Sequence, residues 1–343
     1  MSNSTVPRTG TEADTTKKTP VASGDATGPR KGRPATGKLS LRLRFRRDRV
    51  LLLMTLPAVL LVLLFNYVPI LGNVVAFQEY DPYLSDNGIV SILHSPWVGL
   101  ENFQRIFEDS AFWNSVRNTL VLFVLQLVLY FPILLALLIN SVVRPRVRAI
   151  SQAILYLPHF FSWVLVIAVF QQLLGGAGLL SQLLRDHGYD GLSLMTDPDT
   201  FKFLVTAQSV WKDAGWGIIV FLAALASVSP DLYEAAAMDG ANRWRRMWHV
   251  TLPALRPVIA LLLVLRVGDA LTVGFEQILL QRDAVGPGAA EVLDTFVWWN
   301  GVRNQDFGYA AAAGLVKGVI SLGLVLIANK VAHLMGEQGV YKK

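Results

Sequence analysis

Side chains able to do covalent chemistry are scarce in this sequence of 343 residues. The chain contains no cysteine, which excludes thiol nucleophiles, Cys-based zinc sites and iron–sulfur ligands. His159, His249 and His333 have no partner at the spacing of metal ligands, so we expect them to be structural. We therefore predict no catalytic residue, no metal site and no cofactor on this chain.

One stretch comes close to a phosphate-binding signature. Residues 32–39 read GRPATGKL, compared with the phosphate-loop pattern G-x4-G-K-[ST]. That pattern works because a buried strand leads into a helix N-terminus, where backbone N–H groups converge on phosphate. Here Leu39 occupies the hydroxyl position and the stretch lies in a low-complexity tail, so we expect no ATP binding by this chain.

The elements that carry the remaining polar residues are long apolar segments. Hydrophobic residues make up 53% of the chain and charged residues 16%, with a mean hydropathy of +0.43. Soluble proteins carry roughly 25% charged residues, so the composition excludes a soluble enzyme, a disordered scaffold and a disulfide-stapled domain. A membrane-spanning helix needs about 20 apolar residues. Six segments meet or nearly meet this length: 50–77, 117–141, 150–174, 203–227, 254–275 and 310–334.

These segments predict an all-α integral membrane protein with six transmembrane helices. The fourth segment is the weakest of them, because Lys212 and Asp213 interrupt it. Residues 1–48 are rich in Ser, Thr, Gly, Pro and Lys, which predicts a disordered basic tail before a transmembrane domain at 49–343.

The charges predict the orientation. Most Lys and Arg lie in the tail, in loops 142–149 and 228–253 and at the C-terminus, whereas loops 78–116, 175–202 and 276–309 are acidic. Because Lys and Arg mark cytoplasmic loops, we expect both termini and loop 228–253 in the cytoplasm. Topology and attraction to anionic membrane lipid account for the net charge of +6, so we expect no nucleic-acid partner.

Loop 228–253 carries the most informative pattern. Ser229 is suited to cap a helix, and Pro230 is suited to its first position. Ala235 and Ala236 give a small-residue surface that another protein could approach closely, and Gly240 permits a bend after it. The loop thus predicts a short helix that contacts a partner.

The spacing of this loop resembles the EAA loop of ABC importer permeases. Glu234-Ala235-Ala236, Gly240 and Val250-Thr251-Leu252-Pro253 follow the pattern E-A-A-x3-G-x9-I-x-L-P, with Val250 in place of isoleucine. In that family the short helix docks in a groove of the ATPase subunit and transmits its closure to the membrane spans. The resemblance implies that the residues coupling this chain to an ATPase are Leu232, Tyr233, Glu234, Ala235, Ala236, Asp239, Gly240, Leu252 and Pro253.

Shorter motifs extend the resemblance to the carbohydrate-uptake permeases, and among them to the LplB-like branch. These motifs lie at 67–69, 97–103, 112–113, 117–119, 274–277, 294–297 and 336–339. The resemblance implies a second homologous permease, two cytoplasmic ATPase subunits that bind ATP and Mg, and an extracytoplasmic sugar-binding protein. It also implies the plasma membrane of a bacterium and a carbohydrate substrate, with an oligosaccharide favoured.

A sugar path needs polar groups and aromatic platforms, because sugars present hydroxyl edges and C–H faces. A central Lys or Arg costs about 2.5–3.5 kcal/mol to insert into a membrane, so such residues face the interior of a bundle. The candidates for the path are Gln208, Trp211, Lys212, Asp213, Trp216, Asp269, Glu276, Gln277 and Lys317. Each has a structural alternative: Lys317 could snorkel to the surface, and Arg266 could pair with Asp269.

Two other functions stay open on the sequence. A permease for another nutrient, such as glycerol phosphate or a peptide, would carry the same loop. A standalone secondary transporter would need charged residues paired across spans and would not need an EAA loop. The motifs do not specify the sugar, its length, or which of the two permeases contacts it.

Overall fold

The computed structural model describes residues 49–129, 131–142 and 144–334. The predictions for the 1–48 tail, the phosphate-loop-like stretch, both termini and the motif at 336–339 lie outside the described residues. Contacts divide the chain into two units, 1–62 and 63–343. In the first unit the structure describes one helix, α2 (Arg49–Val62), which is apolar along its length.

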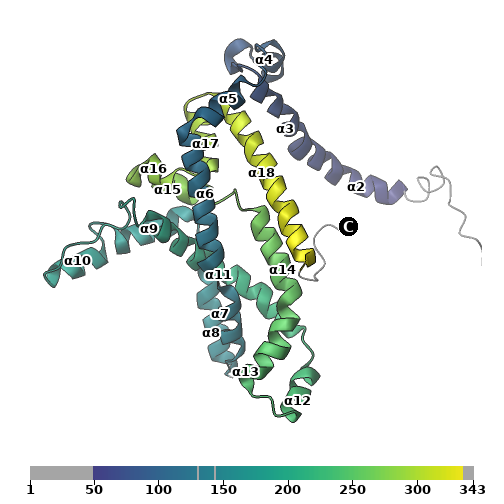
Figure 1. Ribbon diagram of the computed structural model, residues 1–343, viewed down its shortest axis with the longest axis vertical. Helices are drawn as coiled ribbons and strands as arrows, with labels where there is room; N and C mark the ends of the chain where they lie inside the picture. The colour runs from purple at the N-terminus through teal and green to yellow at the C-terminus, as the bar shows by residue number, and fades with distance from the viewer. Residues whose placement is uncertain (1–48, 130, 143, 335–343) are drawn as a thin grey trace, which may run out of the picture. The chain divides into compact units, whose positions relative to one another are not determined.

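In the second unit the described residues form helices joined by turns and loops (Figure 1). Its helices are α3 (Val68–Leu71), α4 (Gly88–His94), α5 (Glu101–Glu108), α6 (Ser110–Leu129), α7 (Pro132–Asn140), α8 (Pro145–Tyr156), α9 (Trp163–Leu174), α10 (Leu179–Asp186), α11 (Phe201–Ala226), α12 (Pro230–Met238), α13 (Arg243–Arg246), α14 (Leu252–Gly268), α15 (Phe275–Val285), α16 (Pro287–Ala290), α17 (Leu293–Trp298) and α18 (Phe307–Leu334).

Among the described residues, six helical stretches are long and apolar enough to cross a membrane, as the sequence predicts. They are Arg49–Phe77, Ser110–Asn140, Trp163–Asp186, Phe201–Ala226, Arg243–Gly268 and Phe307–Val331. The fourth, which looked weakest in sequence, is the continuous helix α11 and the most embedded, with 56% of its apolar window buried. A Cβ at Gly215 would lie 2.6 Å from the carbonyl oxygen of Leu155, so glycine lets α11 and α8 approach closely.

The predicted boundaries of the third span, 150–174, are wrong. Helix α8 ends at Tyr156, and a 3-10 turn at Leu157–Phe160 separates it from α9. Pro158 has no backbone N–H to continue a helix, and the Ser162 hydroxyl accepts a hydrogen bond from the Leu165 N–H at 3.3 Å to start a new one. The third candidate span therefore begins at Trp163, and α8 packs beside α7 and α11.

The fifth span also ends earlier than the predicted residue 275. Helix α14 stops at Gly268 with Asp269 as its C-cap. Gly274 has a left-handed φ of +58°, which an L-residue adopts only with strain, and α15 begins directly after it. Glu276 and Gln277 thus lie on a separate short helix rather than at the outer end of the fifth span.

Two groups of short helices lie toward opposite ends of the long ones. Helices α5 and α17 and a 3-10 turn at Gly72–Phe77 pack against α18 near its start, and α15 and α16 join them beside the first turns of α6 and α11. Helices α12 and α13 lie at the far end beside the start of α14 (Figure 1). The first group comes from the loops predicted to be outside, and the second from the loop predicted to be inside. We call these the outer end and the inner end.

Candidate functional site

Helix α12 at the inner end begins as the sequence predicts. The Ser229 hydroxyl accepts a hydrogen bond from the Asp231 N–H at 3.3 Å, and Pro230 takes the first helical position. Asp231 places a carboxylate in the first turn, where it complements the helix dipole. The helix ends at Met238 and so contains the Glu234-Ala235-Ala236 motif.

Gly240 terminates α12 through its backbone conformation. Its φ is +75°, its N–H donates to the Ala237 carbonyl at 3.0 Å, and the Ala241 N–H donates to the Ala236 carbonyl at 2.9 Å. This pair of bonds is a Schellman motif, which needs a left-handed residue at this position. A Cβ at Gly240 would meet no atom within 4 Å, so glycine is required for the turn and not for space.

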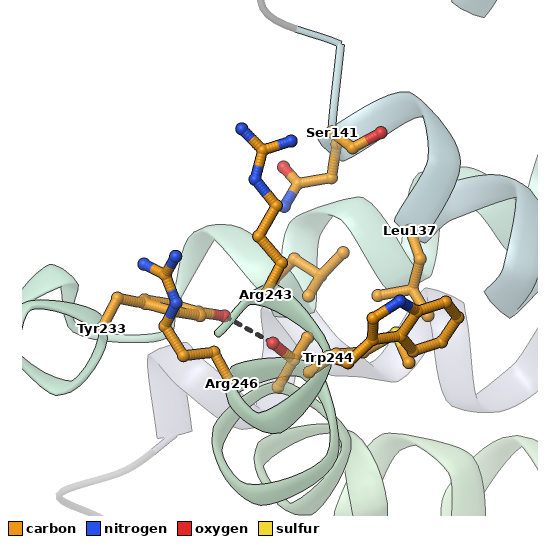
Figure 2. Close-up of a pocket in the computed structure, with 10 residues that line it drawn as sticks. Leu137, Ser141, Tyr233, Arg243, Trp244 and Arg246 are labelled. Atoms are coloured by element: carbon orange, nitrogen blue, oxygen red, sulfur yellow. Dashed lines mark hydrogen bonds between the residues drawn. The ribbon is translucent and has the colours of Figure 1, made fainter. Parts of the chain in front are cut away.

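Beyond the turn the chain leads directly into the fifth span. The Asn242 side chain caps α13 by accepting from the Arg245 N–H at 2.9 Å, and a π-helical turn at Met247–Thr251 joins α13 to α14. The Tyr233 hydroxyl lies 3.1 Å from the Thr251 hydroxyl, a hydrogen bond drawn in Figure 2. Helix α12 is therefore fastened to the base of α14 by this bond as well as by the chain.

Large apolar side chains on α12 and the segment after it are exposed. The exposed fraction is 54% for Leu232, 89% for Met238, 68% for Trp244 and 61% for Trp248. Leu232 and Met238 lie outside the candidate spans, where exposed apolar surface is typical of an interaction site, whereas Trp244 and Trp248 lie in the first turns of the fifth span.

The predicted coupling residues fall into two groups. Glu234, Ala235, Asp239 and Gly240 are exposed, and Tyr233 and Ala236 are half-buried on the same short helix and turn. Leu252 and Pro253 are half-buried in the first turn of α14, beyond the short helix and its turn.

Two of the predicted path residues, Gln208 and Gln277, meet in a buried amide cluster. Gln277 Nε2 donates to Gln208 Oε1 at 2.8 Å and to the Val205 carbonyl at 2.9 Å, and both glutamine side chains are fully buried. Gln281 Nε2 also donates to Gln208 Oε1 at 3.0 Å, and the Ser209 hydroxyl donates to Gln277 Oε1 at 2.8 Å. The cluster fastens α15 to α11 from positions 69 residues apart.

Further along α11, charged and aromatic side chains surround His159. Lys212 is buried and its Nζ donates to the His159 carbonyl at 2.8 Å, so its charge serves the packing of the 3-10 turn against α11. Asp213 Oδ1 lies 3.5 Å from His159 Nδ1, and the Trp216 indole stacks on the His159 ring at 5.8 Å between centroids. Asp213 and Trp216 are not fully buried and share one helix face at i,i+3 spacing, which keeps them as path candidates.

The other candidates are scattered. Trp211 is 43% exposed with its edge against Phe170, and Asp269 lines a small cavity together with Gln126, Arg266 and Thr272. Glu276 is exposed at the start of α15. Lys317 forms an ion pair with Asp294, which joins α18 to α17, instead of extending to the membrane surface.

The described residues hold no group of three His, Asp or Glu side chains that could bind a metal ion.

Comparison with known proteins decides the family. Residues 128–335 match the family described as binding-protein-dependent transport system inner membrane component. The chain belongs to this family.

Individual relatives are similar along most of their length. The polygalacturonan/rhamnogalacturonan transport system permease protein YteP of Bacillus subtilis is 42% identical over 88% of this chain and 93% of its own length. Protein LplB of the same organism is 38% identical over 88% of this chain and 94% of its own length. A crystal structure of a bacterial alginate ABC transporter, bound to a periplasmic protein that carries an alginate pentasaccharide, contains a chain with a TM-score of 0.79 and 36% identity, covering 88% of this chain and 99% of that one.

The chain is thus an ABC transporter permease, an integral subunit of the bacterial inner membrane within a system that includes a binding protein. This result confirms the predicted fold class and the resemblance stated from the EAA loop. The six apolar helices give the permease its spans.

The structure also shows what the outer-end motifs of the permease do. Asn102 is buried, and its Nδ2 donates to the carbonyls of Ala76 and Gln78 at 3.1 Å each. Asn118 Nδ2 donates to the carbonyls of Gly288 and Glu291 at 3.1 and 3.0 Å. These asparagines tie separate outer segments together, so the motifs at 97–103 and 117–119 form a scaffold.

Sequence reasoning missed one buried ion pair of the permease. Arg282 on α15 contacts Glu291 at 2.5 Å, both side chains are 8% exposed, and the guanidinium carbon lies 3.7 Å from the centroid of the Trp299 ring. The sequence shows that Arg282, Glu291 and Trp299 lie in one predicted outer loop, 276–309. Their spacing matches neither a helical nor a strand period, so the sequence does not predict that they pair.

Proposed function

We propose that this permease forms part of the membrane path for an oligosaccharide that contains uronic acid residues. The observation that supports the proposal is that two relatives are named for acidic polysaccharides. The permease 42% identical to this chain is named for polygalacturonan and rhamnogalacturonan, and the solved transporter with a chain 36% identical to it is named for alginate. Polygalacturonan and alginate are acidic polysaccharides. A carbohydrate importer with an acidic substrate is therefore favoured over importers of glycerol phosphate or peptides.

The chemistry of the path is compatible with such a substrate. Arg266, Asp269, Gln126 and Thr272 line a small cavity beside the second and fifth spans, and these polar side chains make that part of the path hydrophilic. On α11, Trp216 supplies an aromatic face for a sugar ring, and the Asp213 carboxylate can accept a hydrogen bond from a sugar hydroxyl. Gln208, Gln277, Lys212 and Lys317 act in our proposal as structural residues, because their polar groups are engaged within the chain.

Coupling to ATP is assigned to the inner end. In our proposal two cytoplasmic ATPase subunits bind ATP and Mg, and the permease itself performs no chemistry. One ATPase subunit binds the exposed face of α12 around Glu234, Ala235 and Asp239. Its closure moves α12, and the Tyr233–Thr251 bond, together with α13 and the π-helical turn at Met247–Thr251, transmits that movement to α14. A second homologous permease completes the path, and the loaded binding protein docks on the outer end.

In our proposal the permease has two states, one open to the outside and one open to the inside, and its ligands shift the equilibrium between them. ATP bound on the inner side and the binding protein docked on the outer side both favour the outward-open state, and hydrolysis restores the inward-open one. A standalone secondary transporter would not require the exposed surface of α12.

The test uses the purified complete transporter with its binding protein. ATP turnover should rise when the binding protein carries an oligogalacturonide, and should stay near the basal rate when it is offered a neutral maltooligosaccharide. Equal or greater stimulation by the neutral sugar would overturn the acidic substrate. Isolation of the permease from membranes without any ATPase would overturn the importer mechanism.

A further inference from the structure

An open groove of about 660 Å³ lies behind α12 at the inner end (Figure 2). We call it the inner groove. It is lined by Leu137, Asn140, Ser141, Leu225, Tyr233, Arg243, Trp244, Arg246, Met247 and Thr251.

The inner groove lies where three membrane spans end. Asn140 is the last residue of the second candidate span, Leu225 precedes the last residue of the fourth, and Arg243 is the first residue of the fifth. A site bounded by the ends of three spans lies at the level where the hydrocarbon core gives way to lipid headgroups. The groove therefore opens at headgroup depth.

The lining of the groove has an apolar part and a basic part. Leu137, Leu225 and Met247 are apolar, and in Figure 2 the Trp244 indole extends toward Leu137. In Figure 2 the side chain of Arg243 extends toward Ser141 and that of Arg246 toward Tyr233, both away from the Trp244 indole. Tryptophan beside arginine is typical of the interface between membrane and water.

The basic part lacks an acceptor within the described chain. The Nε atom of Arg246 is buried and has no hydrogen-bond partner among the described residues, and none of the groove's lining residues is acidic. Arg148 adds a third guanidinium nearby, because its Nη2 donates to Asn140 Oδ1 at 3.3 Å. A buried guanidinium N–H is costly without an acceptor, and a cationic groove with no acidic lining residue favours an anionic ligand.

We infer that the inner groove binds the phosphate of an anionic phospholipid, held between Arg243 and Arg246 with its glycerol and first acyl carbons against Leu137 and Trp244. Guanidinium groups bind phosphate through paired N–H donors, and basic pockets between transmembrane helices bind anionic headgroups. Free phosphate would leave the apolar part unfilled. An acidic side chain of the ATPase would have to enter between the span ends, whereas the exposed face of α12 points to docking outside them.

The lipid would act on coupling. The lipid contacts α13 and the ends of α7 and α11, and Tyr233 and Thr251 line the same groove. An occupied groove therefore holds α13 in a fixed position behind α12. This inference rests on the proposed cytoplasmic position of α12. Its consequence is that ATP turnover depends on anionic lipid as well as on the sugar.

The test measures phosphatidylglycerol retained by the complete transporter, using native mass spectrometry, and ATP turnover in phosphatidylcholine nanodiscs with or without phosphatidylglycerol. Arg246→Gln is compared with Arg245→Gln, a neighbour on α13 that carries the same charge and does not line the groove. Loss of one of the paired guanidinium groups should weaken lipid retention by about fivefold. Ser141→Glu, which adds a negative charge to the groove and leaves both arginines in place, should do the same.

The inference is supported if Arg246→Gln and Ser141→Glu lose both the lipid and its stimulation of ATP turnover while Arg245→Gln keeps them. It is overturned if Arg246→Gln retains lipid like the wild type, if Arg245→Gln loses as much, or if inorganic phosphate displaces the lipid and restores turnover alone. It is also overturned if Arg246→Gln retains lipid and releases the ATPase, because the arginine would then bind that partner. Absence of the ATPase from the wild-type complex would refute the proposed function separately, since native mass spectrometry detects lipid bound to the permease whether or not the ATPase is attached.

Discussion

At the outer end Gln208 and Gln277 are fully buried and hydrogen-bonded to each other, whereas at the inner end Met238 and Trp244 are 89% and 68% exposed. The outer end uses its polar side chains within the chain: Asn118 holds the loop before α17. The inner end uses its polar side chains locally, for caps and turns, and leaves its apolar ones uncovered. The outer end also exposes apolar side chains, Leu93 at 75% among them, so the two ends differ in their polar contacts. Contacts between distant segments make the outer end the more rigid element, whereas local contacts leave the exposed face of α12 available to a partner.

The largest effect should come from Gly240→Trp. The substitution forces an L-residue into a left-handed turn, at a cost of about 1–2 kcal/mol, and redirects the end of α12. We expect membrane insertion to persist and co-purification of the ATPase to be lost, as measured by pull-down from solubilised membranes.

Gly188→Trp is the matched control, because Gly188 also has a positive φ, of +80°, and open space around its Cβ position. Gly188 follows α10, far along the chain from the inner end, so this variant should keep its ATPase. Normal pull-down by both variants would remove Gly240 from the coupling machinery.

Arg282→Ala should produce the largest loss of stability at the outer end. It leaves Glu291 buried without its cation, which costs about 3–5 kcal/mol in such pairs. The apparent Tm in detergent should fall clearly, while Arg303→Ala, which also removes an arginine next to Trp299 but an exposed one, should leave Tm nearly unchanged. Equal Tm values for the two variants would show that the outer end is not the rigid element described.

Substitutions of the neighbours Glu276 and Gln277 should have different effects, one on ATP turnover and the other on stability. Gln277→Leu breaks the amide cluster and should lower stability by about 1–2 kcal/mol, seen as a lower Tm. Glu276→Ala should leave Tm unchanged, since this side chain is exposed, and should lower ATP turnover stimulated by the loaded binding protein. Unchanged turnover in Glu276→Ala would exclude that residue from substrate or binding-protein contact.

The smallest effect should follow from Ser229→Ala. Removal of a helix cap costs about 1 kcal/mol, and here the cost falls on α12 alone. Transport per ATP hydrolysed should fall several-fold without a change in Tm. Ser162→Ala removes a comparable cap from α9 and should lower Tm without changing that ratio; the opposite pattern would argue against local coupling through α12.

The features predicted correctly from sequence are those with local causes. Six spans follow from long apolar runs, and the bounds of α12 follow from Ser229, Pro230 and the left-handed turn at Gly240. Each of these signals acts within a few residues of the element it defines.

The features that sequence did not reveal depend on distant contacts. The pairing of Gln208 with Gln277 spans 69 residues, and nothing in the spacing of either glutamine indicates the other. The break of the third span was visible only as Pro158 and Ser162, and prolines also occur within intact membrane helices, as Pro257 does in α14.

The most direct test of the account is the position of α12 relative to the ATPase. Because the chain has no cysteine, Met238→Cys introduces a single reactive thiol on the exposed end of α12, and Leu93→Cys places one on α4 at 75% exposure. With a bifunctional thiol–amine reagent on the complete transporter, Met238→Cys should cross-link to the ATPase and Leu93→Cys should not. Cross-linking of Leu93→Cys to the ATPase, or labelling of Met238→Cys by a membrane-impermeant reagent added outside cells, would contradict the account.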